Sequence, residues 1–302
     1  MTDWSRVSNL LGDEGMALLA RRRVAIVGLG SGGGAVALFL AMSGVQRFIL
    51  VDDDRLEEGN LLRHVADRRY LGQAKVTAVA DLLRQRNPQV QVVTLKGRFE
   101  QHPEALDDVD LLVVAVDNEP ARHALNEAAL ARRLTAVYAG VYERAVGGDV
   151  ALLRAGVDAC YACWAAELRD EEAPQDQPDY GMLGPEGTLA AEPGLWLHVT
   201  RVAAAQAQLA LNELLRGSPA HEQLPGNTVL LANRGLEIIE GQLTLPQGAI
   251  WATIERKPDC LVCGPAFRDQ TPAQSEDGAQ DPSLAELLND RPARMQVEEH
   301  EE

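Results

Sequence analysis

The stretch from residue 24 to residue 52 constrains the fold of this chain more than any other segment. It reads VAIVG, then LGSGGG, then the apolar run AVALFLAMSG, and ends in FILVD. A short apolar strand, a glycine turn, an apolar helix and a second strand are the repeating parts of a parallel sheet with crossover helices. The segment therefore predicts an α/β fold of the Rossmann type, a mostly parallel sheet with helices on both faces.

The alternation of strands and helices continues beyond this unit and then becomes less regular. A strand at 147–153 is expected to begin an antiparallel addition to the sheet, and Gly217 to close a long amphipathic helix. The expected elements are helices at 74–86, 119–132 and 195–217, and strands at 90–95, 110–117, 135–140, 147–153, 228–240 and 247–254.

The glycine turn has the properties of an anion-binding site. Gly28 permits the tight turn after the strand, Gly30 lets the backbone approach phosphate oxygens, and Gly33 permits close packing of the helix. Ser31 and Gly32 complete the loop, and the helix amino terminus adds partial positive charge. Such a loop also occurs in NAD-dependent oxidoreductases, so it does not by itself identify the chemistry.

Charged residues after the loop favour adenylation of a carboxylate over hydride transfer. Asp52 ends the second strand, where a carboxylate accepts hydrogen bonds from ribose hydroxyls. Arg63 follows in NLLRH, Lys75 in GQAK and Asp117 in VDN. Cations of this kind neutralise a triphosphate and the departing pyrophosphate, and an aspartate holds the magnesium ion.

The ordered motifs GLGSGG, VDDD, NLLRH, LGQAK and VDN resemble the ThiF-type, ubiquitin-activating adenylyltransferase superfamily, over residues 1–265. The resemblance implies an enzyme that uses ATP and Mg²⁺ to activate the C-terminal carboxylate of a small ubiquitin-like or sulfur-carrier protein ending in glycine, with release of pyrophosphate. The nucleotide-binding residues that it implies are Gly28, Gly30, Ser31, Gly32, Gly33, Asp52, Asp54, Asn60, Arg63, Lys75, Asp117 and Asn118.

The amino-terminal segment DWSRVSNLLGDEG resembles the part of the family that precedes the first strand. The resemblance matches Arg6 to an arginine that reaches into the ATP site of a neighbouring subunit, and so implies a homodimer. Arg6, Arg63, Lys75 and Asp117 would then be the catalytic residues. The alternative interpretation from the residues alone is that Arg6 is simply an exposed side chain on a flexible terminus.

All four cysteines fall into two Cys-x-x-Cys pairs, Cys160 with Cys163 and Cys260 with Cys263. Two such pairs brought together supply four thiolates for a tetrahedral Zn²⁺ ion and leave no open coordination position, so the metal is expected to be structural. No cysteine is left over to carry a thioester. In this respect the pattern resembles the molybdopterin synthase adenylyltransferase branch more than the ubiquitin-conjugating branch.

These motifs divide the chain into four expected segments. Residues 1–22 form an amino-terminal helical segment, 23–145 the ATP-binding region, and 146–265 an antiparallel, zinc-bearing lobe. Within that lobe, 165–194 is rich in Pro, Gly, Asp and Glu and is expected to be a crossover loop on the surface. The acidic, polar tail at 266–302 is expected to be disordered.

The net charge and the hydropathy of the chain indicate which partners and which cellular compartment to expect. A net charge of −17 disfavours binding to nucleic acid or to an anionic membrane surface, since both need clustered Lys and Arg. The start lacks the pattern of a signal peptide, and no apolar run approaches the ~18–20 residues that span a bilayer, so a cytoplasmic protein is expected. Three alternatives stay open: an NAD-dependent oxidoreductase, an enzyme that adenylates a tRNA or small-molecule carboxylate, and a noncatalytic scaffold that binds a ubiquitin-like partner.

Overall fold

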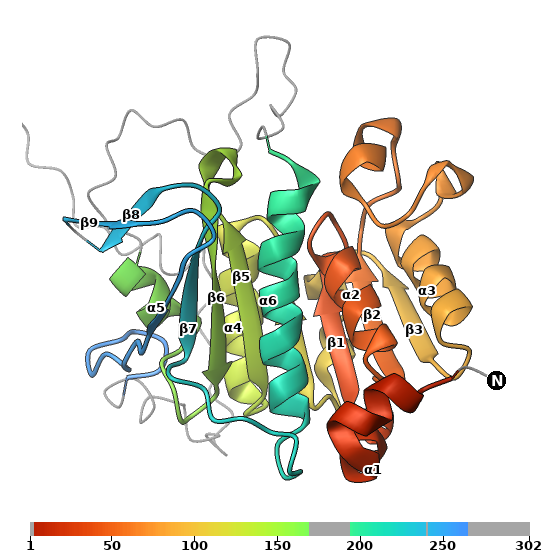
Figure 1. Cartoon of the computed structure of the whole chain (residues 1–302), viewed down its shortest axis with the longest axis horizontal. Helices are drawn as coiled ribbons and strands as arrows, with labels where there is room; N and C mark the ends of the chain where they lie inside the picture. Colours follow the sequence, from red (N-terminus) through yellow and green to blue (C-terminus); the bar gives the residue numbers. More distant parts are fainter. Residues whose placement is uncertain (1–2, 169–193, 240, 265–302) are drawn as a thin grey trace, which may run out of the picture.

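A computed structural model describes residues 3–168, 194–239 and 241–264 (Figure 1). The expected tail at 266–302 lies outside the described residues, as does most of the crossover loop expected at 165–194. The first residues of that expected loop are helical, because helix α5 (Tyr161–Leu168) continues to Leu168. Among the described residues, no helix has the length and apolar character needed to cross a membrane.

The described part of the chain is built on an eight-stranded sheet with the order β10-β7-β6-β5-β4-β1-β2-β3. The strands from β5 to β3 in this order are parallel, whereas β6, β7 and β10 pair antiparallel. The mostly parallel α/β fold is therefore confirmed. The strand bounds are β1 Arg23–Val27, β2 Arg47–Asp52, β3 Gln91–Lys96, β4 Leu111–Val114, β5 Thr135–Val141, β6 Gly147–Arg154, β7 Thr228–Ala232 and β10 Ala249–Ala252, with β8 Leu236–Ile239 and β9 Gln242–Thr244 paired as a separate hairpin.

Helices cover both faces of this sheet (Figure 1). Helices α2, α3 and α6 pack on one face, and α4 and α5 on the other. Successive residues of β1 enter the two cores alternately, because side chains of a strand point to opposite faces. The helix bounds are α1 Ser5–Arg21, α2 Gly33–Met42, α3 Lys75–Arg86, α4 Glu119–Ala131, α5 Tyr161–Leu168 and α6 Trp196–Leu214, with 3₁₀ helices η1 Glu58–Arg63, η2 Arg68–Tyr70, η3 Phe99–Gln101, η4 Pro103–Leu106 and η5 Glu143–Ala145.

The antiparallel strands extend the parallel sheet directly. β6 pairs with β5 on one side and with β7 on the other, over seven and five residue pairs respectively. The expected boundary at residue 146 thus falls between two neighbouring strands of one sheet. Both cores continue across this boundary, because Leu152 enters one and Leu153 enters the other.

The chain order of the strands reverses at β1, which lies between β2 and β4. In open α/β sheets, ligands bind outside the carboxyl ends of the strands at such a switch point. The glycine turn follows β1, Asp52 ends β2 with Asp53 and Asp54 directly after it, and Asp117 lies in the loop after β4. The strand order therefore places the main sequence motifs at one edge of the sheet.

Candidate active site and cysteine cluster

The glycine loop leads directly from β1 into α2. Gly28 has a φ of +87°, and a Cβ there would lie 2.6 Å from the carbonyl oxygen of Ala115. A Cβ on Gly33 would collide with the carbonyl oxygen of Gly28. At Gly30 and Gly32, by contrast, a Cβ would meet nothing within 4 Å. Two glycines are thus required by packing, and the other two leave open space beside the backbone, which fits a bound phosphate.

Asp52 joins the end of β2 to the start of this loop. Its Oδ2 accepts the backbone N–H of Leu29 at 2.6 Å, and its Oδ1 accepts that of Asp54 at 2.9 Å. Burial raises the pKa of Asp52, although these two hydrogen bonds act in the opposite direction. Each carboxylate oxygen has a second lone pair, so the group can still accept hydrogen bonds from ribose hydroxyls.

Lys75 is a buried lysine at the first position of α3. Its side chain is 9% exposed, and its Nζ lies 2.5 Å from Oδ2 of Asp54, whose side chain is 62% exposed. Its backbone N–H also donates to the carbonyl of Asp54 at 3.0 Å. A buried ammonium is costly without a partner, so this pairing fixes the charge beside the end of β2.

Arg63 and Asn60 both lie on η1, between β2 and α3. Asn60 accepts the backbone N–H of Glu57 at 2.9 Å in a capping box, so its side chain shapes the segment. Arg63 is exposed at the end of the same 3₁₀ helix. A role for Arg63 at a triphosphate stays a prediction.

Asp117 follows β4 at the same edge of the sheet. Ala115 donates its N–H to the carbonyl of Val27 at 2.9 Å, so the loops after β1 and β4 begin side by side. Asn118 is the N-cap of α4 and accepts the N–H of Ala121 at 2.9 Å. Asp117 itself is exposed. The structure therefore places the loop that bears Asp117 beside the start of the glycine loop.

Arg6 lies on α1, away from these residues within one chain. A Cβ on Gly15 would lie 3.2 Å from the side chain of Leu215, just after α6, and the side chain of Met16 lies 3.2 Å from a Cβ built on Gly44, just after α2. In Figure 1, α1 (red) is at the lower end of the sheet, and the segment between β2 and α3 (orange) is at the upper end. A role for Arg6 in a neighbouring subunit stays a prediction.

Trp196 is a neighbour of the glycine loop that sequence reasoning missed. It is the first residue of α6, and its indole Nε1–H donates to the carbonyl of Ser31 at 3.1 Å. The two residues are 165 positions apart, so no local pattern could indicate this contact. The hydrogen bond restrains the glycine loop from the side of α6.

His64 packs beneath the glycine loop and has no exposed face toward a substrate. Its Nε2–H donates to the carbonyl of Leu29 at 2.8 Å, and its Nδ1 accepts the N–H of Ala66 at 3.0 Å. These two bonds require the neutral ring. Burial lowers the pKa of His64, and the nearby charge of Lys75 acts in the same direction.

His64→Gln is expected to reduce the loss of stability of the protein in acid. In the unfolded chain, His64 gains a proton near pH ~6.5. In the folded protein its pKa is lower, so the ring stays neutral to lower pH. Stability therefore falls as the pH drops through 6.5 toward the lowered folded pKa. Glutamine can make both hydrogen bonds but has no proton to gain in this range. Between about pH 7.5 and pH 5.5, the melting temperature of the variant should fall by less than that of the wild type. An equal fall in the two proteins would contradict the prediction.

The four cysteines meet in one cluster on the face covered by α4 and α5. Sγ of Cys160 lies 3.9 Å from that of Cys163 and 3.7 Å from that of Cys260, and Cys163 lies 3.5 Å from Cys263. Zinc–thiolate bonds of ~2.3 Å in a tetrahedron place sulfurs ~3.8 Å apart. The cluster therefore fits a four-thiolate Zn²⁺ site.

The surroundings of the cluster favour the thiolate form at Cys260. Burial raises the pKa of Cys160 and Cys263. For Cys260, burial also acts upward, but backbone hydrogen bonds from Cys263 and Val262 help to outweigh it and bring the pKa to about 7. Thiolate is the form that binds a metal, and a bound cation would favour it at the remaining sulfurs.

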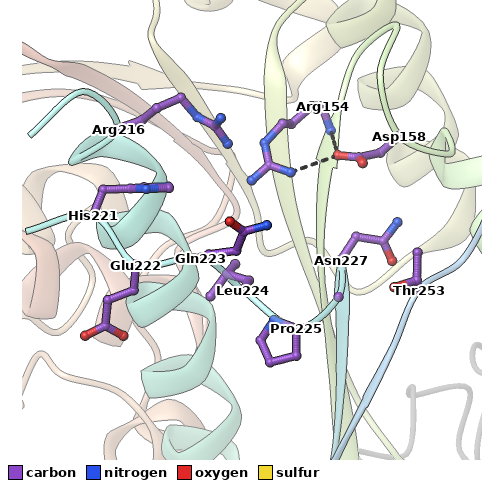
Figure 2. A pocket seen from close by; sticks show the side chains of 11 residues that line it. Arg154, Asp158, Arg216, His221, Glu222, Gln223, Leu224, Pro225, Asn227 and Thr253 are labelled. Atoms are coloured by element: carbon purple, nitrogen blue, oxygen red, sulfur yellow. Dashed lines mark hydrogen bonds and ion pairs between the residues drawn. The ribbon is translucent and has the colours of Figure 1, made fainter.

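A polar cavity of about 360 Å³ lies at the other end of the sheet (Figure 2). Arg154, at the end of β6, lies 2.9 Å from Glu213 and 3.3 Å from Asp158, and Arg216 lies 2.9 Å from the same Glu213. These carboxylates neutralise the two arginines. The cavity is therefore lined by a structural ion-pair network, and the motif residues lie at the opposite edge.

The chain matches a protein family model, curated relatives and solved structures. The model of the ThiF family matches residues 5–229. Ubiquitin-like modifier-activating enzyme 5 of Drosophila erecta is 34% identical over 156 residues, which is 47% of this chain and 39% of that protein. The curated relatives from Drosophila, Culex and Caenorhabditis match over only 38–40% of their own length.

Solved structures share the fold at lower identity. Escherichia coli MccB crystallised with ATP is 19% identical, with a TM-score of 0.63 over 83% of this chain and 69% of that one. The microcin C7 biosynthetic enzyme MccB in complex with N-formylated MccA is 20% identical, with a TM-score of 0.64 over 83% and 70%. At this identity the likeness establishes a common fold.

Proposed function

The chain belongs to the ThiF family, and from this premise we propose that it is an ATP-dependent adenylyltransferase. One observation carries the proposal: the carboxyl ends of β2, β1 and β4 bring Asp52, the glycine loop and Asp117 to one edge of the sheet. An NAD-dependent oxidoreductase would use the first two features but has no use for the buried ammonium of Lys75 or for Asp117.

The proposed reaction joins a carboxylate to the α-phosphate of ATP. A carboxylate oxygen forms a bond to the α-phosphorus, the bond from that phosphorus to the bridging oxygen breaks, and pyrophosphate leaves with the electron pair. The glycine loop would hold the phosphates, and Asp52 the ribose. Lys75 and Arg63 would neutralise the charge that accumulates on the leaving pyrophosphate. A magnesium ion at Asp117 would lower the repulsion between the carboxylate and the phosphates.

The proposed substrate is the C-terminal carboxylate of a small ubiquitin-like or sulfur-carrier protein that ends in glycine. The relatives carry the name ubiquitin-like modifier-activating enzyme 5, and MccB has been crystallised with ATP in one structure and with N-formylated MccA in another. All four cysteines of this sequence belong to the cluster. We therefore propose that the chain stops at the acyl adenylate, and that a partner protein provides the acceptor for the next step.

The proposal includes a homodimer and a structural Zn²⁺ ion. Arg6 is exposed on α1 at the far end of the sheet, so it can serve an active site only in a second copy of the chain. The four thiolates of the cluster would hold Zn²⁺ with no position left for a substrate. This metal would stabilise the fold, whereas Mg²⁺ would act at Asp117.

Exchange of labelled pyrophosphate into ATP tests the proposed function. Small glycine-ending proteins encoded near this gene would be supplied one at a time, each with a matched form whose C-terminal carboxylate is converted to an amide. Exchange with one protein and none with its amide would support the proposal. Tight Mg-ATP binding without exchange would favour a tRNA or small-molecule carboxylate, and absence of ATP binding would favour a noncatalytic scaffold.

A further inference from the structure

We propose that Arg122 is a positioning residue for the loop that carries Asp117, and that the cysteine cluster holds Arg122 in place through Tyr161. The inference rests on the proposed function, because it concerns the magnesium-binding loop of that site. In addition to its expected structural role, the cysteine cluster would then help to position the loop that carries Asp117.

Arg122 lies on α4, and its buried guanidinium connects the carboxyl ends of two neighbouring strands. Its residue exposure is only 6%. The Nε–H donates to the carbonyl of Val116 at 3.2 Å, just after β4, and Nη2–H donates to the carbonyl of Ala139 at 2.9 Å, in β5. The guanidinium carries several N–H donors in one rigid plane, so it can bond both carbonyls at once. A lysine ammonium cannot reproduce these fixed directions.

These contacts fix the backbone on both sides of Asp117. Val116 is held through its carbonyl by Arg122, and Asn118 is held as the N-cap of α4 by the N–H of Ala121. Asp117 itself is exposed, so no core packing sets the position of its carboxylate. The direction in which that carboxylate points therefore depends on the two restrained neighbours.

Tyr161 connects Arg122 to the cysteine cluster. Nη1–H of Arg122 donates to the phenol oxygen of Tyr161 at 3.3 Å, and the phenol donates in turn to Glu119 at 2.9 Å. Glu119 also lies 3.8 Å from Nε of Arg122. The guanidinium thus has a carboxylate and a hydroxyl beside it in addition to the two backbone carbonyls, which offsets the cost of burying its charge.

Tyr161 is itself held by the cluster and by its ring neighbours. It is fully buried and lies between Cys160 and Cys163 in the chain, at the start of α5. Its ring stacks on Tyr138 at 4.5 Å, and its backbone N–H donates to Asn126 at 2.9 Å. Four thiolates gathered around a metal ion would fix both cysteines that flank this ring. Loss of the metal should loosen Tyr161 first, then Arg122 and the Asp117 loop.

The experiment compares Arg122→Lys, Tyr161→Phe and a matched control, Arg154→Lys. Arg154 is also an ion-paired arginine of the same sheet (Figure 2), but it lies at the end of β6, at the opposite edge. The Mg²⁺ concentration that gives half-maximal pyrophosphate exchange is expected to rise about 10-fold in Arg122→Lys and about 3-fold in Tyr161→Phe. ATP affinity without Mg²⁺ and the Mg²⁺ requirement of Arg154→Lys should stay at wild-type values.

Hydrogen–deuterium exchange of the amides at 115–118 provides a readout that is independent of activity. Removal of Zn²⁺ by a chelator should speed exchange there in the folded wild type, and Arg122→Lys should show fast exchange with the metal still bound. Wild-type Mg²⁺ requirement and wild-type amide protection in both variants would overturn the inference. An inactive wild type would instead contradict the proposed function, and the amide exchange would still test the link between the cluster and the loop.

Discussion

Asp117→Ala is expected to lower the rate of pyrophosphate exchange in Mg-ATP by at least about 100-fold, the size of effect seen when one group that stabilises transition-state charge is removed. Asp117 lies at the carboxyl end of β4 beside the glycine loop, where its carboxylate would hold the magnesium ion. Because Asp117 is exposed, its truncation leaves no buried group unpaired, and exposed substitutions usually change stability by less than about 0.5 kcal/mol. The variant should therefore be folded but inactive.

The measurement is the initial rate of exchange at saturating ATP, with the melting temperature recorded for the same preparations. Glu127→Ala is a matched control, because it removes an exposed carboxylate from α4, the helix that follows Asp117. Glu127→Ala should keep wild-type exchange. Full exchange by Asp117→Ala would contradict the proposed mechanism even if the wild type proved to be an adenylyltransferase.

Cys163→Ser is expected to have the largest effect on stability, a fall in melting temperature of at least about 10 °C, since 1 kcal/mol corresponds to ~2–4 °C for a domain of this size and loss of a structural metal removes several kcal/mol. Cys163 is 1% exposed, and its Sγ lies 3.5 Å from that of Cys263. The two residues are 100 positions apart in the chain, so a shared metal ion would tie α5 to the segment after β10. A serine hydroxyl is a poor zinc ligand by comparison with a thiolate.

Thermal unfolding and metal analysis check this prediction together. The wild type should carry about one Zn²⁺ per chain, as four thiolates around one ion require, and Cys163→Ser should lose it. Ala162→Ser is the matched control, because it adds a hydroxyl at the residue before Cys163 on the same helix and leaves all four cysteines in place, and it should keep both metal and melting temperature. A wild type that binds no zinc, or a Cys163→Ser variant as stable as the wild type, would contradict the prediction.

Much of the fold could be predicted from local patterns. The apolar runs that become β1, β2 and β4 were recognisable because strands buried on both faces are apolar throughout. Gly28 and Gly33 were assigned to turn and packing, and the collisions that a Cβ would cause there confirm both assignments. The two Cys-x-x-Cys pairs predicted a single cluster of sulfurs, which the structure also confirms.

Several features of the site had no local signal. The sequence contains Lys75 at a helix start, but only the packing of α3 against the end of β2 shows that the ammonium is buried and paired with Asp54. Asn60 was expected at the triphosphate, and the structure shows its side chain in a capping box. Arg122 was not singled out at all, because its three hydrogen-bond partners come from the loop after β4, from β5 and from α5.

The sequence by itself determined the types of the main elements, the glycine turn after β1 and the pairing of the cysteines that form the cluster. Each of these depends on residues a few positions apart, whose spacing matches the period of a strand, a helix or a turn. The tertiary structure decided that β4 pairs with β1, which brings Asp117 to the glycine loop, and that Arg122 links that loop to the cysteines. Strand order and side-chain networks arise from contacts between distant segments, and such contacts form only when the two cores pack on either side of the sheet.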